Sequence, residues 1–118
     1  MAVCTNKPDA PSRAVLDGLG LSHFFDAVVG GDAAPAQKPD PRHLEAVLAG
    51  LQAAPADAVM IGDGINDLLV AGAAGVPVIH ARYGYGLRGA PDVTPVATID
   101  RFDELPAALA LLDAPARA

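Results

Sequence analysis

Short apolar runs without polar alternation recur along the chain, as expected of strands that are buried on both faces of a parallel sheet. The predicted strands are 2–4, 27–29, 58–61, 77–80 and 97–99. Segments with helical features lie between most of these runs, so strand and helix alternate. This order implies right-handed crossovers and a three-layer, Rossmann-like α/β fold with a parallel sheet.

Helix boundaries follow from capping residues and from apolar spacing. The predicted helices are 11–19, a second that begins at Pro41 and is ended by Pro55, 66–74 and 105–112. Asp40 is suited to cap the second helix, because an aspartate side chain can accept a hydrogen bond from the first N–H groups of a helix. Pro41 fits the first helical position, where a missing N–H costs nothing. Asp103 is the expected cap of the last helix. Gly20 suits the left-handed position after the first helix, and Gly75 ends the third.

Composition narrows the class of protein. The chain has 118 residues, which is the length of one domain, and we expect a single domain over 1–118. Hydrophobic residues make up 52% and charged residues 19%, which is too apolar for a disordered chain. The net charge of -6 argues against a nucleic-acid partner. A single cysteine excludes an intramolecular disulfide and a zinc cluster built on cysteines.

Membrane and export signals are not evident in the sequence. The longest uncharged apolar run, 68–81, is too short to span a bilayer, and glycines and Pro77 interrupt it. The first residues show no basic region leading into an apolar stretch, as a signal peptide would. We therefore expect a cytoplasmic protein without a membrane partner.

Candidate chemistry lies just after the strands, because ligands of such sheets bind beyond the carboxyl ends of the strands. Asp63 and Asp67 stand four residues apart in the turn Gly-Asp-Gly-Ile-Asn-Asp between a strand and a helix. Two carboxylates there suit Mg²⁺, which prefers oxygen ligands. The alternative is structural, with Asp63 as a turn residue and Asp67 in the first turn of the helix, where the macrodipole favours an acid.

Two further positions have both a functional and a plain interpretation. Thr5 follows the first strand and precedes Asn6, and its hydroxyl with free backbone N–H groups suits a phosphate. An ordinary strand end and turn is the simpler explanation of Thr5 taken alone. Lys38 lies in the loop Gln-Lys-Pro-Asp-Pro, where a solvated charge is the simplest explanation of a lysine taken alone.

Taken together, the order of these motifs resembles the haloacid dehalogenase superfamily of phosphohydrolases. VCTNKP resembles the second motif of that superfamily, QKPDP its third and MIGDGINDLLVAGAAG its fourth. The TNKP turn combined with the loop YGYG at 83–86 is most similar to the phosphoglycolate phosphatase branch. The resemblance runs from about Val3 to Leu112, nearly the whole chain.

The resemblance implies a role for each matched residue and a small phosphorylated metabolite as substrate. Thr5 would donate a hydrogen bond to the transferring phosphoryl group, with the backbone of Asn6 helping. Lys38 would neutralise charge between the phosphate and the nucleophile. Asp63 would bind Mg²⁺ directly, and Asp67 would bind it through water or orient Lys38.

The nucleophile motif of that superfamily, DxDGT, does not occur in the sequence. The resemblance therefore implies the C-terminal part of a phosphatase core without its central first strand and its cap. In that fold the absent strand would lie between the strands at 2–5 and 58–61. We expect such a chain to be inactive alone, and either poorly folded or oligomeric. The alternative is a non-catalytic half-domain that binds phosphate or completes a sheet with a partner chain supplying the N-terminal half.

Other polar residues have structural explanations. Cys4 is expected to be a buried structural thiol, and Asp9 and Asp32 to be cap or turn residues. His23 and His43 are predicted on helices as surface or partly packed side chains.

Two features after the fourth strand stay open. His80 ends that strand and is a further candidate to line the site. Tyr83 and Tyr85 form either a loop beside the substrate or a glycine-rich surface turn.

Overall fold

The computed structural model describes residues 1–86 and 92–113. Residues 87–91 and 114–118 of the predicted 1–118 domain lie outside the described residues. The strands are β1 (Ala2–Cys4), β2 (Ala27–Val29), β3 (Met60–Gly62), β4 (Val78–Ala81) and β5 (Ala97–Ile99). The α-helices are α1 (Asp9–Gly18), α2 (Pro41–Leu51), α3 (Ile65–Ala74) and α4 (Leu105–Leu112). Short 3₁₀ turns cover Ser22–Phe24, Pro55–Asp57 and Phe102–Glu104.

All strand pairings among the described residues are parallel, as predicted. β1 pairs with β2 in one sheet, with Val3 opposite Val28. The other sheet has the order β3-β4-β5, with Gly62 opposite His80 and His80 opposite Thr98. The carboxyl ends of neighbouring strands therefore lie at the same edge of each sheet, where the sequence places its candidate residues.

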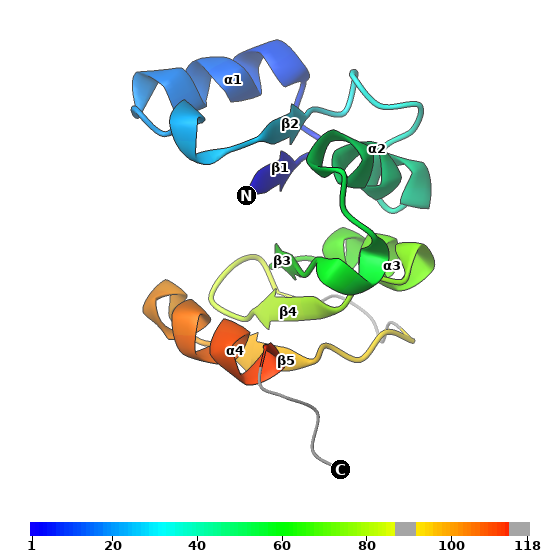
Figure 1. The fold of residues 1–118 in the computed structure, drawn as a ribbon, viewed down its shortest axis with the longest axis vertical. Coiled ribbons are helices and arrows are strands. Elements are labelled where there is room, and N and C mark those ends of the chain that lie inside the picture. Colours follow the sequence, from blue (N-terminus) through cyan, green and yellow to red (C-terminus); the bar gives the residue numbers. More distant parts are fainter. Residues whose placement is uncertain (87–91, 114–118) are drawn as a thin grey trace.

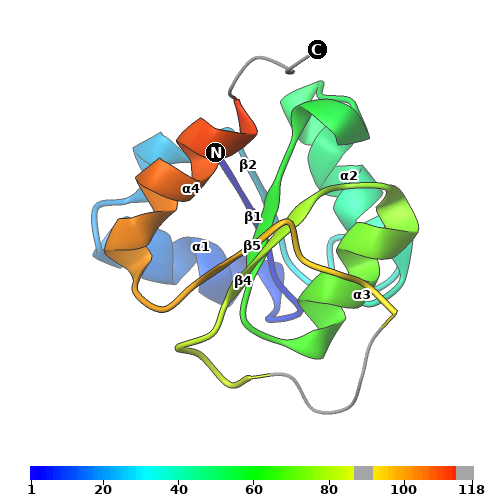
Figure 2. The same ribbon diagram turned by 90° about the horizontal axis from the view of Figure 1, so that it is seen from below.

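The helices form layers on both faces of the strands. Figure 2 shows α1 and α4 on one side of the strands and α2 and α3 on the other. α2 packs on β1 and β2, α3 packs on β3 and β4, and the two helices pack on each other. This arrangement confirms the predicted three-layer α/β architecture, and the α2–α3 contact joins the two sheets.

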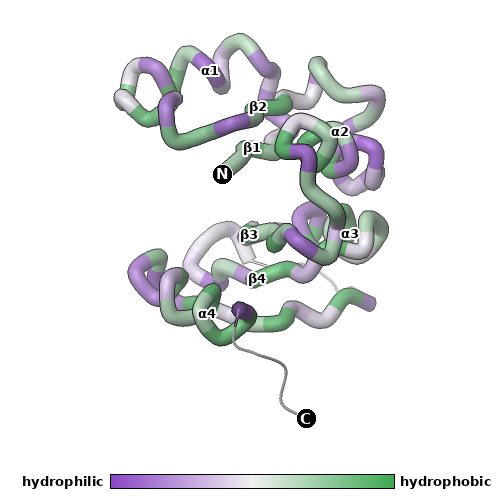
Figure 3. The backbone as a smooth tube through the Cα atoms, viewed as in Figure 1, coloured by the Kyte–Doolittle hydropathy of each residue, from purple (hydrophilic) through white to green (hydrophobic). Residues whose placement is uncertain are grey.

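The main core lies between α2, α3 and the strands. Leu44, Val47 and Leu48 of α2 and Leu68 and Val70 of α3 are all buried there. Figure 3 shows hydrophobic residues around β3 and β4. Spacings of three and four in α2 therefore mark its buried face, as the sequence pattern indicates.

β1 and β3 each have one neighbour. Within the described residues β1 is hydrogen-bonded only to β2 and β3 only to β4, so the chain forms two sheets instead of one. Figure 1 shows β1 and β3 as the strands on either side of the division between the sheets. The unpaired edges are compatible with the expected position of a further strand, which stays a prediction.

Several element ends differ from the sequence-based prediction. The first helix begins at Asp9 instead of Pro11. The N–H groups of the first helical turn have no partner within the helix, so Pro11, which lacks an N–H, fits inside that turn and does not have to begin the helix. α2 ends at Leu51, well before Pro55, because Gln52 adopts the left-handed conformation with φ 54°. The third strand lies at Met60–Gly62, two residues later than its predicted start.

Capping of the helices was predicted correctly at α2 and wrongly at α4. Asp40 accepts a hydrogen bond from the Arg42 N–H, as expected of an N-cap. Asp103 caps nothing, because it lies within the 3₁₀ turn that precedes α4. Glu104 instead accepts hydrogen bonds from the N–H groups of Asp100 and Arg101 at 2.7 Å each.

None of the helices in 1–86 and 92–113 combines the length and the apolar character that crossing a bilayer requires.

Candidate active site

The carboxyl ends of β1 and β3, with the loop before α2 and the loop after β4, surround a hollow of about 500 Å³. The residues that line it are Asn6, Lys38, Asp63, Gly64, Ile65, Asn66, Asp67, Tyr85 and Gly86. Four of the five candidates named from the sequence are among them, and the fifth, Thr5, is not. The fold thus brings together residues that are far apart in the chain, from Asn6 to Gly86.

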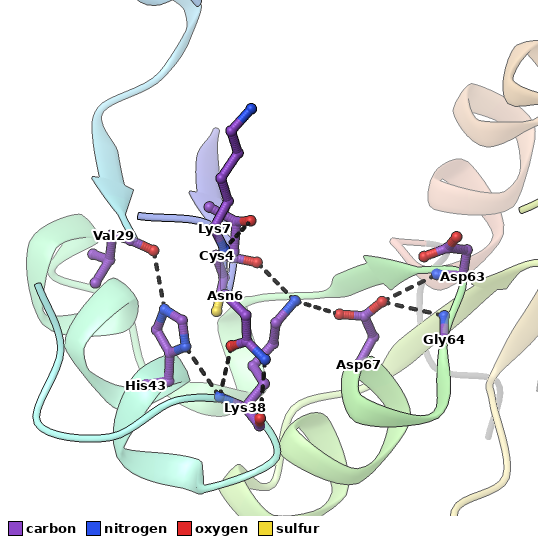
Figure 4. Close-up of polar contacts among 10 residues, drawn as sticks. Cys4, Asn6, Lys7, Val29, Lys38, His43, Asp63, Gly64 and Asp67 are labelled. Carbon is purple, nitrogen blue, oxygen red and sulfur yellow. Dashed lines mark hydrogen bonds and ion pairs between the residues drawn. The ribbon is translucent and has the colours of Figure 1, made fainter. Parts of the chain in front are cut away.

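Lys38 links the two sheets at this hollow. Its Nζ donates to Oδ1 of Asp67 at 2.6 Å and to the carbonyl oxygen of Cys4 at 2.9 Å. Figure 4 shows Lys38 between these two partners, one on the β1 side and the other on α3. The side chains of Lys38 and Asp67 are only 11% and 12% exposed. Lys38 is therefore a nearly buried, paired cation and not a solvated loop residue.

Asp67 is held from its other oxygen by the turn after β3. Oδ2 accepts hydrogen bonds from the N–H groups of Asp63 at 3.2 Å and Gly64 at 3.3 Å. Gly62 leaves room for this carboxylate, since a Cβ there would overlap the Asp67 side chain. Asp67 therefore lies in the first turn of α3 and also pairs with Lys38.

Asn6 holds the backbone of the Lys38 loop. Its Nδ2 donates to the Lys38 carbonyl oxygen at 3.1 Å, and its Oδ1 accepts from the Lys38 N–H at 2.9 Å. The amide side chain thus bonds to both backbone polar groups of Lys38. The Asn6 N–H, in contrast, has no hydrogen-bond acceptor among the described residues and remains available to a ligand.

His43 corrects the prediction of a surface or partly packed histidine, because it is fully buried in α2. Nδ1 accepts from the Lys38 N–H at 3.2 Å, so Nε2 carries the proton and donates to the Val29 carbonyl oxygen at 3.0 Å. The spacing of four residues between His43 and Val47 was the signal for its burial. The polar character of histidine nevertheless favoured the prediction of a surface or partly packed position. His23, in contrast, is exposed as expected.

Thr5 lies beside the hollow without lining it. Its Oγ1 accepts a hydrogen bond from the Lys7 N–H at 3.1 Å, and its own N–H donates to the Val29 carbonyl oxygen at 3.3 Å. The hydroxyl proton is left as a donor, because the oxygen serves here as an acceptor.

Asp63 carries the carboxylate that is best suited to a cation. Oδ2 accepts a hydrogen bond from the Tyr85 N–H at 2.9 Å, whereas Oδ1 has no hydrogen-bond partner among the described residues. No group of three or more His, Cys, Asp or Glu side chains able to hold a metal occurs in 1–86 and 92–113. A single free carboxylate oxygen beside an open hollow suits Mg²⁺, which takes few protein ligands and completes its shell with water and phosphate oxygens.

Asp9, Asp32 and Cys4 have structural roles. The oxygens of Asp9 accept from the Gly30 N–H and from the Arg13 side chain, and Asp32 accepts from the Asp9 N–H, so both acids brace turns. The hydrogen bond from Arg13 lowers the pKa of Asp9. Burial raises the pKa of the partly buried Cys4 thiol to about 11, which keeps the thiol protonated at neutral pH.

The structure places His80 and the tyrosines that follow β4 in different surroundings. His80 is buried in β4 and does not line the hollow; its Nε2 has no hydrogen-bond partner among the described residues. Tyr85 lines the hollow and is 95% exposed as a residue, whereas Tyr83 does not line it.

Known proteins are similar to this chain in sequence and in fold. Residues 1–75 match the family of haloacid dehalogenase-like hydrolases. A protein of Rhodospirillum rubrum named phosphoglycolate phosphatase is 44% identical over 105 residues, which cover 89% of this chain and 44% of that protein. A protein of the same name from Caulobacter vibrioides is 51% identical over 85 residues, covering 72% of this chain and 36% of the other.

Solved structures are also similar to this chain in fold. A crystal structure described as a predicted phosphoglycolate phosphatase from Haemophilus somnus superposes with a TM-score of 0.81 at 29% identity, over 92% of this chain and 48% of that one. CbbY from Rhodobacter sphaeroides in complex with phosphate gives 0.79 at 28% identity, over 92% and 50%.

The parallel α/β fold and the matched region define a hydrolase domain, and the chain belongs to the haloacid dehalogenase-like hydrolase family. It spans about half the length of the curated relatives it matches.

Proposed function

We propose that this chain serves the Mg²⁺-dependent hydrolysis of a small cytoplasmic phosphomonoester, with phosphoglycolate as the favoured substrate. The observation that carries the proposal is the nearly buried pair of Lys38 and Asp67 at the rim of the hollow. The relatives named phosphoglycolate phosphatase support the choice of substrate.

The phosphate-binding residues in this proposal are Thr5, Asn6 and Lys38. The Thr5 hydroxyl and the Asn6 N–H are hydrogen-bond donors at the end of β1, and Lys38 adds a positive charge nearby. Asp67 orients the ammonium of Lys38 by accepting from it at 2.6 Å. Fixed donors aimed at a phosphoryl group supply most of the catalysis in phosphoryl transfer, because the charge they stabilise spreads over its oxygens.

Asp63 is the residue proposed to hold the metal directly, through the oxygen that the Tyr85 N–H does not occupy. When bound, Mg²⁺ would neutralise charge on the phosphate oxygens. Asp67 is already engaged by Lys38 and by two backbone N–H groups, so in this proposal it reaches the metal only through water.

The attacking group is proposed to come from a carboxylate that the hollow does not contain. Asp63 and Asp67 are the only acidic residues among those that line it, and Asp67 is ion-paired. The DxDGT motif that would supply the nucleophile is not found in the sequence. We therefore expect no turnover by this chain alone.

Release of inorganic phosphate from phosphoglycolate, with an aryl phosphate for comparison, tests the proposal. The chain is assayed with Mg²⁺ alone and after mixing with a separately produced polypeptide that carries DxDGT from the N-terminal half of the Rhodospirillum rubrum relative. We expect activity only in the mixture, and loss of it in Lys38→Ala and Asp63→Asn. Asp57→Asn, an exposed aspartate in a 3₁₀ turn, is the matched control that should retain it.

Two results would count against the proposal. Activity of the mixture that survives both site substitutions would remove Lys38 and Asp63 from the reaction. Activity of the chain alone that requires both residues would show that a side chain of this sequence attacks phosphorus, with Asp9 and Asp32 the first to be replaced.

A second candidate function is favoured by the unpaired edges of β1 and β3. A half-domain without catalysis of its own would bind phosphate or accept a strand from a partner chain between these two edges. Copurification from the native cell with a separate chain carrying DxDGT would support this function. A single longer polypeptide carrying both segments would exclude it.

A further inference from the structure

The loop after β4 contacts the side chain of Asp63. The Tyr85 N–H donates to Oδ2 of Asp63 at 2.9 Å. Gly84 lies so close to this aspartate that a Cβ built on the glycine would overlap the Cβ, Cγ and Oδ2 of Asp63. These are two separate contacts on one carboxylate, one a hydrogen bond and the other a close approach that only glycine permits.

Backbone hydrogen bonds anchor the loop. β4 runs beside β3, with His80 opposite Gly62, so the loop leaves the sheet next to the strand that ends at Asp63. The Arg82 N–H donates to the Ile99 carbonyl oxygen at 2.9 Å, and the Gly84 N–H donates to the Ala81 carbonyl oxygen at 3.3 Å. These bonds hold the loop beside the sheet, so the position of the Tyr85 N–H does not depend on the tyrosine side chain, which belongs to a residue that is 95% exposed.

Resting on the proposed role of Asp63, we propose that Gly84 and the Tyr85 N–H are positioning elements for divalent-cation binding. They fix the rotation of the Asp63 carboxylate, so that Oδ2 faces the loop and Oδ1 remains the metal donor. Partners that orient a ligating carboxylate commonly change metal affinity by 10- to 100-fold when they are removed. The cation affinity of this chain therefore depends on a loop about twenty residues beyond its ligand in the sequence.

Gly84→Ala tests the close approach, because the added methyl group must displace either the loop or the carboxylate. The readout is the dissociation constant of Mg²⁺ by calorimetry, repeated with Mn²⁺ by electron paramagnetic resonance, on the full chain without substrate. We expect about a tenfold or larger loss of affinity. Gly18→Ala, at the exposed end of α1 where no atom lies within 4 Å of the added Cβ, is the matched control and should bind as the unchanged chain does.

Two substitutions of Tyr85 separate its backbone from its ring. Tyr85→Ala keeps the N–H and should bind the cation within about twofold, whereas Tyr85→Pro removes the N–H and should reproduce the loss seen in Gly84→Ala. The proline variant also provides the test if Gly84→Ala fails to fold, as judged by circular dichroism.

The two possible failures give different results. Binding that requires Asp63, as shown by its loss in Asp63→Asn, but that is unchanged in Gly84→Ala and Tyr85→Pro would overturn the positioning role alone. Equal binding, or equal absence of binding, in the unchanged chain and in Asp63→Asn would overturn the metal site and this inference with it.

Discussion

The ammonium of Lys38 and the carboxylate of Asp67 lie 2.6 Å apart and connect two sheets that share no backbone hydrogen bond among the described residues. Lys38 also reaches the Cys4 carbonyl oxygen of β1, while Asp67 receives N–H groups from the turn after β3. This ion pair thus adds a polar link between the two halves of the site, which the packing of α2 on α3 already joins. The consequences of this arrangement can be measured in stability as well as in ligand binding.

Breaking the Lys38–Asp67 pair should be costly, because each partner alone would leave a nearly buried charge. We expect Lys38→Met and Asp67→Asn each to lower the free energy of unfolding by about 3 kcal/mol. The double variant should lose at least about 1 kcal/mol less than the sum of the two. Urea denaturation of the four proteins of this cycle measures the coupling.

The pair formed by Arg101 and Asp103, at 2.9 Å but mostly exposed, is the control cycle and should show coupling close to zero. Equal coupling in the two cycles would contradict the special position of Lys38.

Replacement of His43 should loosen the Lys38 loop. His43→Phe fills the buried volume but removes the Nε2 donor to the Val29 carbonyl oxygen, which then keeps only the Thr5 N–H at 3.3 Å, at an expected cost of about 1 kcal/mol. His43→Gln retains a side-chain amide donor and should recover part of that loss. His23→Phe, at an exposed histidine, should leave the midpoint of urea denaturation nearly unchanged. Equal midpoints for the His43 and His23 variants would show that the buried hydrogen bonds contribute nothing.

The Cys4 thiol should react slowly, because burial raises its pKa from 9.0 to about 11. Iodoacetamide alkylates the thiolate, so the rate near neutral pH should lie well below that of the unfolded chain in urea. The shift also predicts a direction for stability. The folded chain keeps its proton to a higher pH than the unfolded chain does, so this contribution is complete below pH 9 and is lost as the pH rises toward 11.

Thermal unfolding of the chain and of Cys4→Ala between pH 8 and 11 checks this direction. The decline in melting temperature over that range should be smaller in the alanine variant, and an identical decline in both proteins would refute the assignment.

The unpaired edges of β1 and β3 should cause self-association, because exposed strand edges template pairing with other chains. We expect sedimentation equilibrium to show dimers or larger species whose fraction rises with concentration. A polypeptide that supplies the absent strand should return the chain to a single defined complex. A monomer with a sharp, cooperative melt over a hundredfold range of concentration would be the contrary result.

Local sequence signals determined the order of the elements and most of the candidate residues. β1, β2, β5 and α4 lie where apolar runs and spacing predict them, because such patterns reflect how many faces of an element are buried. Asp40 caps α2 through its own neighbour Arg42, a contact within two residues that turn chemistry alone predicts. Boundaries at α1 and α2 were less well predicted, because competing prolines left more than one acceptable end.

Only the tertiary structure decided how the site residues contact one another. Three features depend on contacts between segments that are distant in the sequence. They are the burial of His43, the hydrogen bonds of Asn6 to the Lys38 loop, and the contact of Gly84 with Asp63. No periodicity within one segment encodes such contacts, since they depend on which strands become neighbours and on the register of their ends. Taken by their local sequence, Lys38 and Asp67 were separate candidates, and only the family resemblance offered Asp67 as a residue that orients Lys38. Their pairing follows from the packing of α2 on α3, which places the loop before one helix beside the first turn of the other.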